Sequence, residues 1–138
     1  MKPLSYLVLI AGLVAASDPP NAEAIKKEMK KLEGTWVMVS ATSNGKPIEE
    51  APGGEWIFAD DRLTVRMKDG ETTKNRYEID PSQKPKAINT IREAGDEGPG
   101  LGIYEFDSDT LKVCFGPKRP TEFTAKGQVL FTLKRKKP

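Results

Sequence analysis

The sequence predicts an all-β protein of roughly eight short antiparallel strands that follow a short N-terminal helix. After Gly34, apolar and polar side chains alternate with a period of about two, which is typical of half-buried strands. Turn residues interrupt this pattern roughly every 8–12 residues, the spacing of a sandwich or a barrel. The connections are mostly of hairpin length and strands do not alternate with helices, so neighbouring strands are expected to pair antiparallel.

The helix is predicted over the residues just before Gly34. Ile25, Met29 and Leu32 recur at i, i+4 and i+7, with lysines and glutamates between them. Asn21 is placed to cap the first turn, and Gly34 ends the helix.

Eight short segments carry the strand pattern. They are Thr35–Thr42, Glu55–Ala59, Leu63–Lys68, Thr73–Ile79, Ala87–Arg92, Leu101–Phe106, Thr110–Phe115 and Gln128–Arg135. Ser43-Asn44-Gly45-Lys46 is expected to form a turn, and Asp69-Gly70 is a hairpin signal. Asp107-Ser108-Asp109 joins two of the segments tightly, and the residues from Pro47 to Gly54 are expected to form a loop.

Residues 1–24 predict a signal peptide and 25–138 a single domain. Leu4–Ala16 is a nearly continuous apolar run behind a basic start, too short for a spanning helix of roughly 20 residues. Cleavage after Ser17 and cleavage after Ala24 both suit the small residues there; a retained anchor or a core helix is the alternative. We therefore expect an exported protein, periplasmic or extracellular, with no transmembrane segment in the mature chain.

Composition excludes several kinds of chemistry. The 22 Lys+Arg and 20 Asp+Glu give a net charge of +2. The electrostatic potential of the whole chain therefore does not favour nucleic acid as a partner. The absence of histidine excludes Ser-His-Asp and Cys-His nucleophiles, histidine-built zinc sites and histidine pH switches. Cys114 is the single cysteine, expected as a small buried strand residue rather than a reactive thiol. No catalytic residue, metal ligand or cofactor is expected.

Gly34-Thr35-Trp36 follows the predicted helix and opens the first strand. It resembles the Gly-x-Trp signature of lipocalins and fatty-acid-binding barrels. That resemblance implies the full fold class, an all-β, eight-stranded antiparallel up-and-down (lipocalin-like) barrel with a short N-terminal helix. It also implies that Trp36 closes one end of the barrel and that a basic residue of the last strand packs over it. Arg135 is the natural candidate for a cation–π contact, with Lys134 as the alternative.

Nearly all of the mature chain, from about Leu32 to Arg135, resembles a small lipocalin-like domain family of unknown function, found mostly in planctomycete bacteria. Where such relatives often have a glycine, this chain has Ser108. The resemblance implies a fold class and export, and brings no reaction, ligand or catalytic residue. The matching segments are Leu32-Glu33-Gly34-Thr35-Trp36, Asn44-Gly45-Lys46-Pro47, Tyr77-Glu78-Ile79-Asp80-Pro81, Lys84-Pro85-Lys86-Ala87-Ile88, Gly102-Ile103-Tyr104-Glu105, Asp107-Ser108-Asp109-Thr110-Leu111-Lys112-Val113-Cys114-Phe115 and Arg119-Pro120-Thr121-Glu122-Phe123.

Five residues are candidates for contact with a ligand in the barrel interior or at its rim. They are Trp56, Phe58, Tyr77, Tyr104 and Arg119. The aromatic residues fall in predicted strands, where filling the core is the alternative role. The Arg119 guanidinium suits an anionic head group, and a salt bridge to Glu122 or another acid is its alternative.

The sequence favours an exported, non-enzymatic lipocalin-like barrel that binds a small apolar or amphipathic molecule. The alternative is a barrel filled by its own side chains that acts as an envelope protein-interaction module. A hydrolase built on carboxylates is a third class, with candidates Asp60, Asp61, Asp80, Glu105, Asp107 and Asp109. An apolar cavity of a few hundred Å3 would favour the first class.

Overall fold

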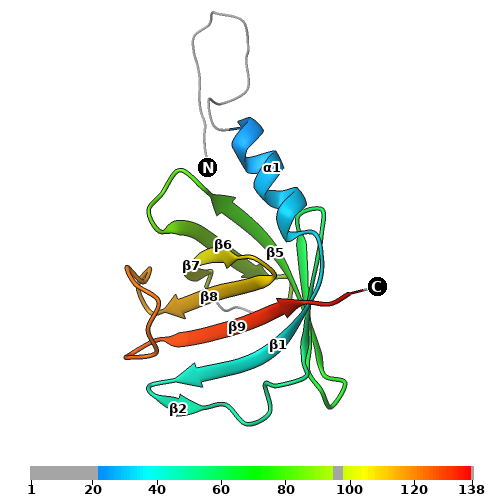
Figure 1. Ribbon diagram of the computed structural model, residues 1–138, viewed down its shortest axis with the longest axis vertical. Coiled ribbons are helices and arrows are strands. Elements are labelled where there is room, and N and C mark those ends of the chain that lie inside the picture. The colour runs from blue at the N-terminus through cyan, green and yellow to red at the C-terminus, as the bar shows by residue number, and fades with distance from the viewer. Residues whose placement is uncertain (1–21, 95–97, 138) are drawn as a thin grey trace, which may run out of the picture.

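The computed structural model describes residues 22–94 and 98–137 (Figure 1). The predicted Asn21 cap and most of the predicted signal peptide lie outside these residues. The elements are α1 (Ala22–Leu32), β1 (Gly34–Ser43), β2 (Lys46–Pro47), β3 (Glu55–Ala59), β4 (Arg62–Arg66), β5 (Thr72–Asp80), β6 (Lys86–Arg92), β7 (Gly100–Asp107), β8 (Thr110–Gly116) and β9 (Val129–Arg135). Over the described ranges, no helix has the length and apolar character needed to cross a membrane.

Eight strands form a closed antiparallel barrel, which confirms the predicted fold class. From β3 to β9 each strand pairs with the next along the chain, and β1 pairs with both β3 and β9. The β1–β9 pairing runs from Trp36 opposite Arg135 to Ser43 opposite Val129, with a bulge between Met38 and Ser40. All strands predicted from the alternation are therefore present, in the expected order.

The short strand β2 corrects the expectation of a loop from Pro47 onward. Asn44 and Gly45 have φ angles of 51° and 80°. This turn sends the chain back along β1, so that Ser43 pairs with Lys46 and Thr42 with Pro47. Two residue pairs are too few to show as alternation in the sequence.

One end of the barrel is closed by α1 and by the start of β1. Trp36 is fully buried, and its indole N–H donates to the Leu32 carbonyl at 2.8 Å. The Arg135 guanidinium lies 4.1 Å from the centre of the Trp36 ring and donates to the carbonyls of Lys31 and Glu33. Gly34 has a φ of 119°, and a Cβ there would lie 3.3 Å from Arg135 Nη1. These residues tie the helix, the first strand and the last strand together.

The loop between β8 and β9 covers part of the outer wall. Cys114 follows the inward-facing Val113 and so points outward, yet it is fully buried. Its thiol contacts the Thr124 carbonyl at 3.3 Å and accepts from the Gln128 amide at 3.2 Å. Burial raises the pKa of this thiol, so it stays in the protonated, unreactive form at neutral pH.

Candidate ligand-binding site

A cavity of about 420 Å3 occupies the end of the barrel opposite α1. Its walls come from the ends of the strands and from the connection between β1 and β3. This volume falls within the range of roughly 300–1,000 Å3 that is typical of small-molecule sites. Most of its lining is apolar, contributed by Met38, Ile48, Ala51, Trp56, Leu63, Val65, Met67, Phe115 and Phe131.

Glycines on β7 help to keep this end of the barrel open. Gly100 lines the cavity, and Gly102 follows it on the same face. A Cβ on Gly102 would lie 2.8 Å from the Phe115 ring, and one on Gly100 would lie 2.5 Å from Thr90 Oγ1. The Phe115 ring therefore lies close against β7, in space that a side chain at position 102 would occupy.

The polar side chains of the cavity gather on one wall. Thr73 and Asn75 come from β5, and Thr90 and Arg92 from β6. These strands are neighbours, and Asn75 pairs with Arg92 in the register. The Asn75 amide donates to the Leu63 carbonyl at 3.3 Å. A molecule in the cavity would thus meet polar groups on one side and apolar side chains on the other.

Trp56 combines a large apolar surface with an unsatisfied donor. It is 3% exposed, and its ring centre lies 5.0 Å from that of Phe131. Among the buried side-chain donors and acceptors of the described residues, its indole N–H alone has no hydrogen-bond partner. A buried polar group left unpaired costs about 1–3 kcal/mol, so an acceptor that reached this N–H would recover that cost.

The structure brings four of the five candidate residues to the interior and separates the fifth. Trp56 lines the cavity, whereas Phe58, Tyr77 and Tyr104 are buried in the core between it and α1. Phe58 and Tyr77 pack edge to face with ring centres 5.1 Å apart. Arg119 lies on the outer wall, where it donates to the carbonyls of β6 and β7 rather than to a ligand of the interior.

The two buried tyrosines stay neutral. Burial, with smaller contributions from the charges of Glu33, Asp61 and Asp60, raises the pKa of Tyr77 to about 12. Burial also raises the pKa of Tyr104, and its hydrogen bond to Glu28 adds to the shift. Neither hydroxyl can act as a base near neutral pH.

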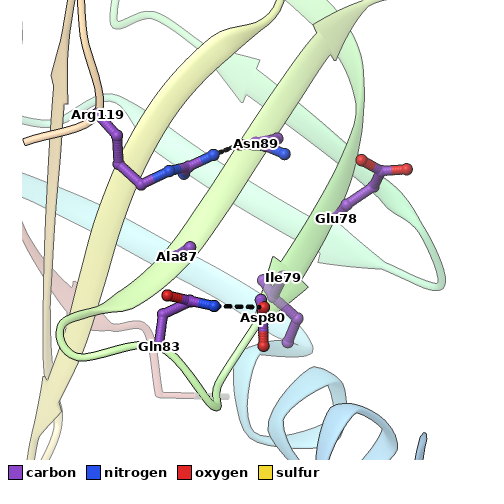
Figure 2. Close-up of a pocket in the computed structure, with 7 residues that line it drawn as sticks. All are labelled: Glu78, Ile79, Asp80, Gln83, Ala87, Asn89 and Arg119. Atoms are coloured by element: carbon purple, nitrogen blue, oxygen red, sulfur yellow. Dashed lines mark hydrogen bonds between the residues drawn. The ribbon is translucent and has the colours of Figure 1, made fainter. Parts of the chain in front are cut away.

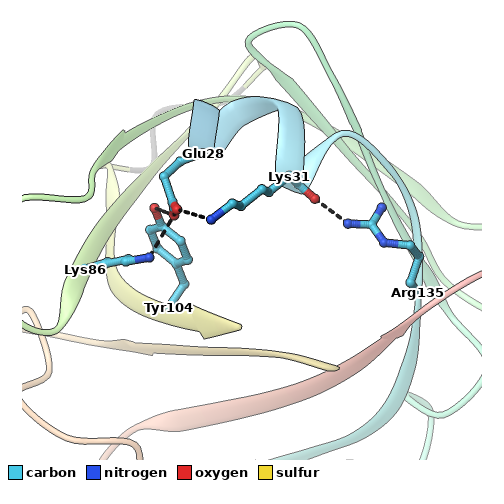
Figure 3. A network of polar contacts seen from close by, with 5 residues as sticks. All are labelled: Glu28, Lys31, Lys86, Tyr104 and Arg135. Atoms are coloured by element: carbon cyan, nitrogen blue, oxygen red, sulfur yellow. Dashed lines mark hydrogen bonds and ion pairs between the residues drawn. The ribbon is translucent and has the colours of Figure 1, made fainter. Parts of the chain in front are cut away.

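A polar network holds α1 on the barrel (Figure 3), and the sequence analysis did not predict it. Glu28 is 6% exposed and accepts from the Tyr104 hydroxyl at 2.7 Å and from Lys86 at 3.1 Å, with Lys31 at 3.5 Å. Burial alone would raise the pKa of Glu28, but these partners together outweigh it and lower the pKa. The signal in the sequence was a glutamate at i+3 from Ile25, inside the apolar stripe of the helix.

The fold and the cavity define the class of the molecule, a closed antiparallel barrel with room for one small molecule. No family model matches the chain, and no solved structure matches it. The phosphoribosylformylglycinamidine synthase subunit PurL of Pyrobaculum calidifontis is 28% identical over 116 residues. That similarity covers 80% of this chain and 16% of the PurL subunit, so the chain spans a small part of this relative. The resemblance to small lipocalin-like domains stays a prediction from the sequence.

Proposed function

We propose that this chain is an exported, non-enzymatic binding protein of the lipocalin-like kind, which holds a small apolar or amphipathic molecule in its barrel. The observation that carries the proposal is the 420 Å3 cavity at the end opposite α1. A barrel of eight strands is wide enough to be filled by side chains or to hold one small ligand. Here the half next to α1 is packed with aromatic rings, and the other half is hollow.

The lining of the cavity supports binding rather than catalysis. Among the described residues that line it, Arg92 is the one ionisable side chain. General acid–base catalysis needs a group that gains or loses a proton near the working pH, and an arginine does not. None of the six carboxylates considered for hydrolysis is among the described residues that line the cavity. The polar wall of β5 and β6 would instead orient an amphipathic molecule.

Extraction of the natively purified protein tests this proposal. The protein is isolated from each fraction of the cells that make it, extracted with organic solvent and measured by mass spectrometry. We expect one small molecule in near-stoichiometric amount, with the protein in the exported fraction. An empty protein that co-purifies with a protein partner would contradict the proposal and favour the interaction module.

A matched pair of variants links the molecule to the cavity. Val65→Phe places a larger side chain in the cavity lining, whereas Val39→Phe makes the same change at a site that is 50% exposed. The first variant should lose the co-purified molecule and the second should keep it. Equal retention by both would show that the molecule is bound elsewhere.

A further inference from the structure

A second hollow, of about 440 Å3, lies on the outer wall of the barrel (Figure 2). Glu78 pairs with Asn89 and Asp80 pairs with Ala87 across β5 and β6. These four residues alternate with the inward-facing Tyr77, Ile79 and Ile88, so they face away from the interior cavity. Arg119 reaches the same hollow from the loop after β8. We call this hollow the outer groove.

Arg119 is half-buried and held by neutral acceptors. Its Nη1 donates to the carbonyls of Gly102 at 2.8 Å and Ile88 at 3.3 Å, and its Nη2 donates to Asn89 Oδ1 at 2.6 Å. Over residues 22–94 and 98–137, no carboxylate lies within salt-bridge distance of this guanidinium. A guanidinium has five N–H donors; the described residues accept from three of them, which leaves two for a ligand, and none of these residues places a carboxylate directly against the charge.

Asp80, like Arg119, is held by hydrogen bonds to uncharged groups. Its Oδ1 accepts from the backbone N–H and the hydroxyl of Ser82 at 3.1 and 2.6 Å, and its Oδ2 accepts from the Gln83 amide at 3.1 Å. The Ser82 hydroxyl is the largest cause of a lowered pKa, so this carboxylate is ionised at neutral pH. Glu78 lies two residues earlier on the same face and is exposed.

The outer groove therefore presents a fixed cation and two carboxylates, neither of which is within salt-bridge distance of it, although the Arg119 charge is near enough to contribute to the lowered pKa of Asp80. A purely anionic ligand would be repelled by Glu78 and Asp80, and a purely cationic ligand by Arg119. A molecule that carries both charges satisfies both sides. Guanidinium binds carboxylates with directional, charge-assisted hydrogen bonds, and carboxylates accept from ammonium groups in the same way.

We propose that the outer groove binds a small zwitterion of the free amino acid class, with its carboxylate on Arg119 and its ammonium group toward Glu78 and Asp80. This site is separate from the interior cavity and takes a different class of molecule. The alternative is that Arg119 only fastens the loop after β8 to the sheet.

Titrations followed by NMR distinguish the two readings. The side-chain amide signals of Asn89 and Gln83 in 15N-labelled protein report on the outer groove. L-serine serves as the zwitterion, acetate as the anion and methylammonium as the cation. We expect L-serine to shift both signals at millimolar concentrations, with acetate and methylammonium binding about tenfold more weakly or worse. No shift with L-serine, or equal binding of acetate, would overturn the proposal.

Two variants complete the test. Glu78→Gln changes an exposed side chain, so it leaves the fold intact; it should weaken L-serine about tenfold and leave acetate unchanged or stronger. Arg119→Gln should weaken both L-serine and acetate. Glu71→Gln, in the turn between β4 and β5, is the matched control and should change neither. If Glu78→Gln binds L-serine as the unaltered protein does, the proposal is wrong.

Discussion

Glu28→Ala tests how α1 is attached to the barrel. The substitution leaves the hydroxyl of Tyr104, a side chain that is fully buried, without its partner. A buried hydroxyl that loses its partner costs about 2 kcal/mol. The lost ion pairs add about 1 kcal/mol, a low figure because the side chains of Lys86 and Lys31 are 37% and 62% exposed and solvent screens them. We expect the free energy of unfolding to fall by about 3 kcal/mol.

Urea denaturation and thermal melting measure this loss. A change of about 3 kcal/mol corresponds to a drop in Tm of about 10 °C for a domain of this size. The double variant Glu28→Ala/Tyr104→Phe should regain about 1–2 kcal/mol over Glu28→Ala alone, because it also removes the orphaned hydroxyl. Glu23→Ala, at an exposed position of the same helix, is the control and should cost no more than about 0.5 kcal/mol. A loss as small as that of Glu23→Ala, or no recovery in the double variant, would refute the reasoning.

The remaining predictions concern pH and one turn. The lowered pKa of Glu28 adds stability that is fully present above its unfolded-state value of 4.5 and is lost as the pH falls through the folded-state value. Glu28→Gln should therefore make the free energy of unfolding less dependent on pH, as measured by urea denaturation from pH 6 down to about pH 3. Tyr77 contributes stability that is fully present below its unfolded-state pKa of 10.0 and is lost as the pH rises through about 12. The tyrosinate absorbance of Tyr77 should therefore appear at a higher pH in the folded protein than in the unfolded one. Tyr77→Phe should reduce the loss of stability at alkaline pH. Ser108 has a φ of 57° in the turn between β7 and β8, so Ser108→Gly should raise the free energy of unfolding by about 0.5 kcal/mol while Ser108→Ala gives no gain, as chemical denaturation would show.

The strands and most turns could be predicted because their signals are local. The alternation of Leu63 and Val65 with Thr64 and Arg66 is visible in four consecutive residues, all of which lie in β4. Asp69-Gly70 gave the next turn because Gly70 readily adopts its φ of 97°. The two residue pairs of β2 could not be seen, since they follow from where a turn directs the chain.

The sites depend on features that the sequence does not display. The polar wall of the cavity exists because Asn75 pairs with Arg92 in the register of β5 and β6, and register is a property of two strands together. Arg119 lies on the outer wall because the loop after β8 folds back over the sheet. The hollow itself depends on how the Phe115 ring lies against Gly102, which no periodicity encodes.

A binding titration tests the central claim, that the end of the barrel opposite α1 takes an apolar molecule. N-phenyl-1-naphthylamine is a neutral apolar dye whose fluorescence rises in an apolar site. We expect saturable one-to-one binding with quenching of Trp56, weakened at least about tenfold by Val65→Phe and unchanged by Val39→Phe. Binding that is absent, or equal in the two variants, would contradict the account.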